Sequence, residues 1–184
     1  MLADVIDTFF AHYKKSFETL IVPHDPQWPS VCEIGQPWQD GEGQSWTQWQ
    51  PVRRHPAADD FAGLEAALEM PIHPDIKTHY SRFWSANLDA LAPDGCVSLL
   101  FLWNQQDVDR LVENLIGHAL ACRHNRTPFS AFFACTEDDS DLFLTINNTT
   151  GEVQLEEPGK KPIRTVAGSL EEFVAQLVPA PTER

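Results

Sequence analysis

Residues 96–123 join an apolar run to an amphipathic segment, and this pairing predicts the centre of the fold. Residues 96–103 (C-V-S-L-L-F-L-W) are nearly all apolar, which is typical of a strand covered on both faces. Asn104 stands at the expected N-cap of the following helix, with Asp107 in its first turn, where negative charge is favoured. The helix should bury one broad apolar stripe: Val108, Leu111, Val112, Leu115, Ile116, Ala119 and Leu120. A buried strand that leads into a long helix indicates a layered domain of sheet and helices.

Before this unit, the pattern first predicts a helix and then a tryptophan-rich hairpin. Residues 4–21 place apolar side chains on one helical side, and Pro23 ends that pattern. Residues 28–54 hold four tryptophans with glycines between them. This composition favours a loop or hairpin, with a strand near residues 45–52.

Two shorter helices are expected next. Residues 59–70 predict a helix capped by Asp59 or Asp60 and stopped by Pro71. Pro74 then occupies a first-turn position and opens a helix that runs to about residue 87. Its inward side chains should be Ile76, Tyr80, Phe83 and Trp84.

After the central helix, alternating apolar positions predict four more strands, at residues 129–135, 141–147, 152–155 and 162–166. Ser169 with Glu172 forms a capping-box pattern that opens a final helix. We therefore predict a single α+β domain over residues 1–184, with a mostly antiparallel central sheet and helices packed on it. Its N-terminal helix lies within residues 1–22, and residues 180–184 should fray.

Charge narrows the choice of partner. The chain has 27 acidic and 13 basic side chains and a formal net charge of −14. Such a surface repels the phosphates of nucleic acids and of anionic lipids, so we expect neither as a direct ligand. A basic protein partner is favoured instead.

The sequence suggests a cytosolic protein. The first residues are acidic where a secretion signal would be basic, and no apolar run approaches the ~20 residues that span a bilayer. The four cysteines are scattered: Cys32, Cys96, Cys122 and Cys135. Three of them stand in apolar or helical surroundings, which favours reduced and buried thiols.

No motif specifies a reaction, so we predict neither catalytic residues nor a cofactor or metal. The P-loop, the dinucleotide fingerprint and the nucleophile elbow are missing from the sequence. His118 and Cys122 are one turn apart on a helix and could share a metal, but a boundary histidine and a semi-buried thiol are favoured. Gly117, inside the same helix, indicates close approach of a neighbouring element.

The acidic residues fall into clusters that could form a docking surface. Some of them are ordinary solvated charges, but the lopsided net charge favours a partner-binding role for others. The candidates lie on the short helix, on the central helix and after the strand at 129–135: Asp59, Asp60, Glu65, Glu69, Asp107, Glu113, Glu137, Asp138 and Asp139. Cytosolic loops of membrane proteins are rich in Lys and Arg and would suit such a surface.

Several segments closely resemble the Syd family, the SecY-interacting proteins of proteobacteria, over nearly the whole chain. The most specific piece is E-N-L-I-G-H at 113–118, within the longer match at 99–118. The other matches are W-Q-P-V at 49–52, the segment at 64–75, Tyr80 with Phe83, and N-T-T-G-E-V at 148–153. The tryptophan-rich region at 37–49 departs from the family pattern.

The resemblance implies an α/β fold of the SUKH superfamily and a non-enzymatic cytosolic protein. Such a protein would be loosely attached to the cytoplasmic side of the inner membrane through the SecY subunit of the protein translocase. A role in checking assembly of that complex is also implied. The superfamily contains immunity proteins as well, so neutralisation of a basic toxin is the alternative. The oligomeric state is left open.

Overall fold

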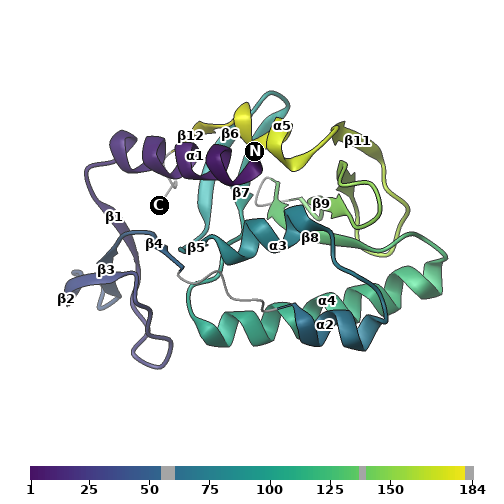
Figure 1. The fold of residues 1–184 in the computed structure, drawn as a ribbon. Helices are drawn as coiled ribbons and strands as arrows, with labels where there is room; N and C mark the ends of the chain where they lie inside the picture. The colour runs from purple at the N-terminus through teal and green to yellow at the C-terminus, as the bar shows by residue number, and fades with distance from the viewer. Residues whose placement is uncertain (55–60, 137–139, 181–184) are drawn as a thin grey trace.

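A seven-stranded antiparallel sheet forms the centre of the protein, in a computed structural model that describes residues 1–54, 61–136 and 140–180 (Figure 1). The strand order is β11-β10-β9-β8-β7-β6-β12. The strands are β6 (Leu88–Ala92), β7 (Gly95–Leu99), β8 (Ser130–Cys135), β9 (Phe143–Asn147), β10 (Val153–Glu156), β11 (Arg164–Ala167) and β12 (Val178–Pro179). Sequential hairpins account for most of this order, which confirms the predicted antiparallel α+β class.

Helices cover this sheet on two sides. The helices are α1 (Leu2–Ser16), α2 (Ala62–Leu68), α3 (Pro74–Ser81), α4 (Gln105–Asn125) and α5 (Leu170–Ala175). The ring of Phe173 on α5 packs edge-on against Phe133, with 5.7 Å between centroids. His118 on α4 instead packs against Phe132 and Phe143. Helices α4 and α5 therefore lie on opposite faces of the sheet, and α2 packs on α4.

A second sheet of three strands projects beside α1, at the left of Figure 1. Its order is β1-β3-β2, with β1 (Leu20–Pro23), β3 (Ser45–Trp49) and β2 (Glu33–Gln39). The predicted hairpin with a strand near 45–52 is therefore confirmed. The short strands β4 (Val52–Arg53) and β5 (Phe83–Trp84) pair with each other and lead back to the main body.

The central strand is shorter and more exposed than predicted. Strand β7 ends at Leu99, and Cys96 on it is exposed whereas Val97 and Leu99 are buried. The prediction of a strand at 96–103 covered on both faces was wrong because the chain leaves the sheet after residue 99. Leu102 instead forms a parallel bridge to Trp84, which carries the chain toward the start of α4.

Two helices end earlier than the apolar pattern predicted. Helix α1 stops at Ser16, and the backbone at Phe17 is already extended. Phe17 still packs on Tyr13, with 4.9 Å between ring centroids, so the helical periodicity continued past the end of the helix. Helix α3 likewise ends at Ser81, because Phe83 and Trp84 form strand β5.

The predicted caps of α4 and α5 are confirmed. Asn104 Oδ1 accepts a hydrogen bond from the Asp107 backbone N–H, and Ser169 Oγ accepts one from the Glu172 N–H. Such caps satisfy backbone donors that a helix leaves free. For α2, Phe61 occupies the N-cap position, and the predicted caps at 59 and 60 lie outside the described residues.

Three local expectations about burial were wrong. Leu120 is 58% exposed although Ala119 and Cys122 on the same helix are buried, so Leu120 lies outside the buried side of α4. A Cβ on Gly117 would have open space within 4 Å among the described residues, so no neighbouring element approaches it closely. Cys96 and Cys135 are exposed, whereas Cys32 and Cys122 are buried.

Two segments that resembled the Syd family lie against each other. The Asn148 side-chain oxygen accepts a hydrogen bond from the His73 N–H, and its Nδ2 donates to the Pro71 carbonyl. Gly151 has φ of +75°, and a Cβ there would lie 2.7 Å from the His73 ring. Glycine is therefore required by both the backbone and the contact. The N-T-T-G turn fixes the entry into α3.

Candidate partner-binding surface

The start of α4 is held by Asp107. Its Oδ1 accepts a hydrogen bond from the Trp28 indole N–H at 3.2 Å, and its Oδ2 accepts one from the Trp103 backbone N–H at 2.9 Å. Both carboxylate oxygens thus bind groups of the same chain. Asp107, predicted as a partner-binding residue, positions the turn before α4 and the Trp28 loop.

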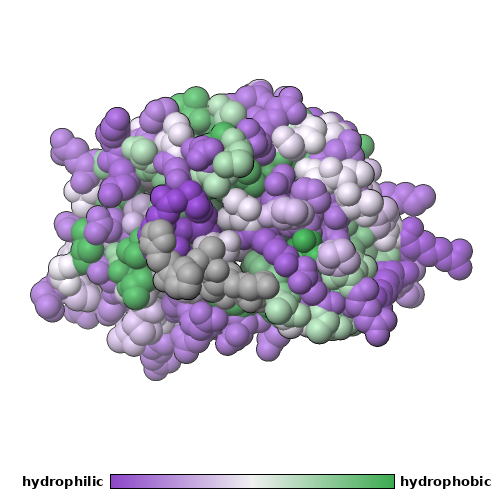
Figure 2. Space-filling view, in the orientation of Figure 1, coloured by the Kyte–Doolittle hydropathy of each residue, from purple (hydrophilic) through white to green (hydrophobic). Residues whose placement is uncertain are grey.

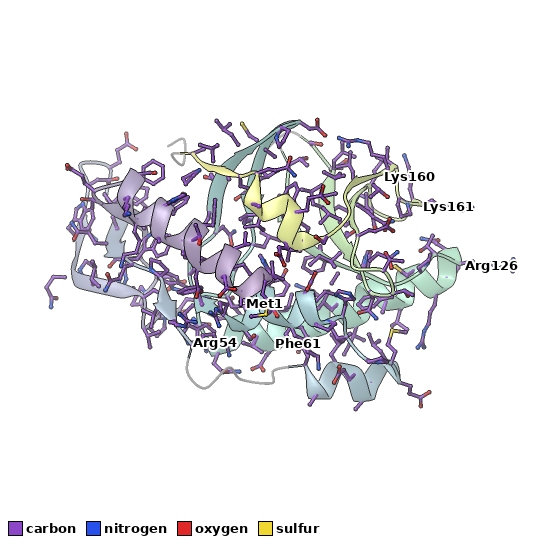
Figure 3. All side chains as sticks on the ribbon, turned by 45° about the horizontal axis from the view of Figure 1, so that its top comes forward. Met1, Arg54, Phe61, Arg126, Lys160 and Lys161 are labelled. Atoms are coloured by element: carbon purple, nitrogen blue, oxygen red, sulfur yellow. The ribbon has the colours of Figure 1, made fainter. Side chains whose placement is uncertain are left out.

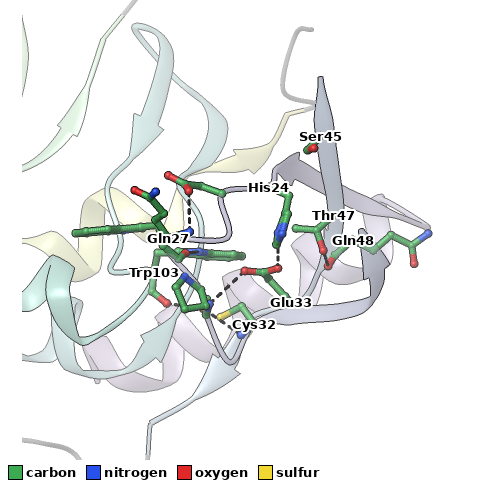
Figure 4. Close-up of polar contacts among 12 residues, drawn as sticks. His24, Gln27, Cys32, Glu33, Ser45, Thr47, Gln48 and Trp103 are labelled. Carbon is green, nitrogen blue, oxygen red and sulfur yellow. Dashed lines mark hydrogen bonds and ion pairs between the residues drawn. The ribbon is translucent and has the colours of Figure 1, made fainter. Parts of the chain in front are cut away.

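The loop before β2 is fastened to the same turn (Figure 4). The Trp103 indole N–H donates to the Trp28 carbonyl at 3.1 Å, and Ser30 Oγ donates to the Trp103 carbonyl. Glu33 accepts from the Ser30 N–H and lies 2.9 Å from His24 Nδ1. These contacts join the three-stranded sheet to the first turn of α4.

A hollow of about 400 Å³ lies between this loop and the main body. The Arg110 guanidinium sits 3.7 Å from the centroid of the Trp28 ring, at the border of the hollow. The residues that line the hollow include Asp25, Trp28, Asn87, Phe101, Trp103 and Asp107. Sequence reasoning missed Asp25. The signal for it was the D-P-Q-W-P turn at residues 25–29, which places an exposed carboxylate just before Trp28.

Exposed carboxylates continue along α4 and α2. Glu113 is exposed on α4, one turn after the exposed Asp109, and Glu69 is exposed at the end of α2. The two helices pack together, and Arg123 Nη2 on α4 donates to the Leu68 carbonyl at 3.1 Å. Glu69 and Glu113 are thus exposed on two helices that pack together, and α4 also carries the exposed cations Arg110 and Arg123.

Glu65 has a role within the chain. Its Oε1 accepts from the Ile72 backbone N–H at 2.8 Å and lies 2.7 Å from Lys77 Nζ. The Ile72 hydrogen bond, followed by Lys77, lowers the pKa of this carboxyl. Glu65 thus ties α2 to α3, and it adds little to a surface that a partner could contact.

The remaining five predicted positions lie outside the described residues: Asp59, Asp60, Glu137, Asp138 and Asp139. Of the predicted positions that are described, Glu69 and Glu113 are exposed on neighbouring helices, and Asp107 lies in the first turn of α4.

His118 and Cys122 do not form an activated pair. Cys122 Sγ lies 3.6 Å from His118 Nε2, which is also 3.2 Å from Ser130 Oγ. Burial lowers the pKa of His118 and raises the pKa of Cys122. A nucleophilic cysteine needs the opposite shifts, toward thiolate and imidazolium. Within the described ranges, no three His, Cys, Asp or Glu side chains are grouped to hold a metal ion.

The described helices include none that could cross a membrane, because none combines the necessary length with an apolar composition. The fold and surface therefore define an α+β domain with exposed carboxylates on two packed helices, among other places. A family model described as "Syd protein (SUKH-2)" matches residues 1–179, so the chain belongs to the Syd family. This confirms the resemblance inferred from the sequence.

Individual relatives agree with this assignment. Protein Syd of Pseudoalteromonas atlantica is 36% identical over 184 residues, which cover 99% of this chain and 96% of the relative. Protein Syd of Colwellia psychrerythraea is 38% identical over 164 residues, covering 85% and 79%. Protein Syd of Alteromonas mediterranea is 39% identical over 177 residues, covering 95% and 94%.

Proposed function

We propose that this protein is a non-enzymatic binding module for the SecY subunit of the bacterial protein translocase. It binds at the cytosolic face of the inner membrane, where it holds basic loops of the channel. Membership of the Syd family supports the choice of partner. The observation that carries the mechanism is the net charge of −14, with exposed carboxylates on α4 and α2 and a hollow at the start of α4 that Asp25 lines.

The expected contact is electrostatic. Glu69 and Glu113 are exposed and can contact Lys or Arg of a partner. Asp107 and Glu65 instead form hydrogen bonds within the chain that position the helices. Cytosolic loops of membrane proteins are rich in Lys and Arg. The same net charge repels anionic lipid, so attachment to the membrane runs through the channel protein. We extend the proposal to a check on translocase assembly, in which the surface holds loops that a complete complex would cover.

A binding assay on inner-membrane vesicles tests this proposal. Vesicles that contain the channel should retain the protein at low salt, and matched vesicles that lack it should not. Retention should fall as salt rises, because exposed charge pairs are screened over about 10 Å at 0.1 M ionic strength. Equal retention on both kinds of vesicle would refute the choice of partner. Salt-independent retention would refute the electrostatic mechanism.

The alternative, an immunity protein that neutralises a basic toxin, uses the same charge. It is less favoured because the matched relatives carry the name Protein Syd. Co-purification with a basic nuclease, in place of the channel, would favour the alternative.

A further inference from the structure

The outward face of the three-stranded sheet is the feature that the proposed function does not use. In an antiparallel sheet, residues directly opposite each other share a face. Trp46 stands opposite Pro23 on β1 and opposite Trp38 on β2. Gln48 stands opposite Ile21 and Ile34 in the same way. Two rows therefore cross this face, one of proline and two tryptophans and one of glutamine between two isoleucines.

The other face of the same sheet is covered. Thr47 and Trp49 alternate with the outward residues of β3, and both are buried. The Trp49 ring packs edge-on against Trp103, 5.9 Å between centroids. Figure 4 shows Gln48 pointing away from Thr47 and His24, toward the opposite side of the sheet. The two faces thus differ in kind: one joins the body and the other faces outward.

The outward face is apolar and accessible. Ile34 and Trp38 are each 38% exposed, and Gln48 and Pro23 are also exposed. Apolar side chains interrupt the hydrophilic surface over this sheet, at the left of Figure 2. A hollow of about 130 Å³ that Ile34 and Gln48 help to line continues the face toward the end of α1. A patch of this kind on a small projecting sheet marks an interaction surface.

The charges around the face select the partner. Residues 16–52 contain neither Lys nor Arg, and their carboxylates Glu18, Asp40 and Glu42 are not engaged on the covered side, as Glu33 is. Lys14 is the one cation among the described residues that line the adjoining hollow. Asp40 Oδ2 accepts from the Trp46 indole N–H at 2.7 Å, so a carboxylate borders the tryptophan row. That hydrogen bond also lowers the pKa of Asp40, which keeps the group charged. An indole beside a carboxylate suits a Lys or Arg side chain.

We propose that the outward face of the β1-β3-β2 sheet is a second docking surface, for a segment of a partner protein that alternates cationic and aliphatic side chains. The cationic groups stack on Trp38 and Trp46 beside Asp40, and the aliphatic groups cover Ile21 and Ile34. The net charge of −14 disfavours a second copy of this chain, or an anionic lipid, as the occupant of this face, because like charges repel. The edge strand β2 carries Pro37 and an irregular register, so the contact uses the face of the sheet and not strand addition.

Calorimetric titration with a short synthetic peptide of alternating Arg and Leu tests this proposal, which does not depend on the channel as partner. The peptide should bind the full-length protein, and a peptide of alternating Glu and Leu should not. Trp38→Ala should weaken binding roughly fivefold, in line with a cation–π contact. Glu42→Lys, a change in an exposed turn, should weaken it by a similar factor.

Leu91→Ala is the matched control, because Leu91 is 47% exposed on the other sheet. It should leave the affinity unchanged. The proposal is overturned if the wild-type protein shows no saturable binding or if Leu91→Ala and Trp38→Ala weaken it equally. It is also overturned if Glu113→Lys abolishes peptide binding while Trp38→Ala does not. Self-association that Trp38→Ala removes would identify a second copy as the occupant and overturn it as well.

Discussion

The seven-stranded and three-stranded sheets differ in how many of their faces are covered. Helices α4 and α5 pack on opposite faces of the large sheet, whereas the small sheet uses only its inner face against the body. The presence of aromatic residues does not distinguish the two sheets. Trp49 is buried, but Trp38, from the same stretch of sequence, is 38% exposed. The lesson is that tryptophans in a short hairpin can serve a surface as well as a core.

Substitution in the large sheet should have the greatest effect on stability. Phe133 is fully buried between α3 and α5 and contacts both His79 and Phe173. Phe133→Ala should lower the free energy of unfolding by about 3–5 kcal/mol, because it leaves a cavity in the core. Urea titration measures this change. A loss below about 1 kcal/mol would mean that the core collapses around the site.

A pH effect should come from the same core. Burial lowers the pKa of His79 to about 4, whereas a histidine in the unfolded chain has a pKa of about 6.5. Its Nε2 lies 2.8 Å from the Leu100 carbonyl, and Nδ1 is buried without a partner among the described residues. As pH falls through this range, the unfolded state takes up a proton first. The contribution of neutral His79 to the free energy of unfolding should therefore be fully present above about pH 6.5. It should be lost toward pH 4, by up to about 3 kcal/mol.

The variant His79→Gln isolates this contribution from that of the carboxyl groups. It should unfold at lower urea than the wild type at neutral pH, but with a smaller loss between about pH 6.5 and pH 4. Identical pH dependence in the two proteins would show that His79 is not the titrating group.

A smaller effect, of opposite sign, is expected on α4. Gly117 is exposed in the helix interior, and a Cβ would meet no atom of the described chain within 4 Å. Gly117→Ala should therefore raise the free energy of unfolding by about 1 kcal/mol. Thermal unfolding would reveal it as a higher Tm. A lower Tm would contradict the open space found around Gly117.

The smallest effect is expected on the small sheet. Trp38→Ala removes an exposed side chain, so it should change the free energy of unfolding by less than about 0.5 kcal/mol. The comparison between the sheets fails if this variant and Phe133→Ala destabilise the protein equally in urea.

Much of the fold could be predicted from local patterns. The Asn104 and Ser169 caps and the antiparallel class were predictable because their signals lie within a few residues. The end of α1 was not, because Phe17 keeps the helical period after the helix has stopped. Cooperation between distant segments, such as Trp84 with Leu102, decides where β7 ends.

The surface was harder to predict than the fold. Sequence marks acidic residues but does not reveal which of them are used inside the chain, as Glu65 and Asp107 are. The sequence also does not reveal which cationic side chains folding brings close to one another. In Figure 3, Arg126, Lys160 and Lys161 gather at the end of the molecule away from the small sheet. The uneven distribution of charge became visible only when segments far apart in sequence were placed together.

Charge reversal tests the central claim most directly. The affinity of the purified protein for channel-containing vesicles would be measured for Glu113→Lys and for Asp4→Lys. Glu113 is exposed on α4, and Asp4 is exposed on α1, which packs against α5 on the face of the sheet opposite α4. Both variants gain the same charge, so the proposed surface predicts roughly fivefold weaker binding for Glu113→Lys and little change for Asp4→Lys. Equal weakening by the two variants would contradict a localised docking surface.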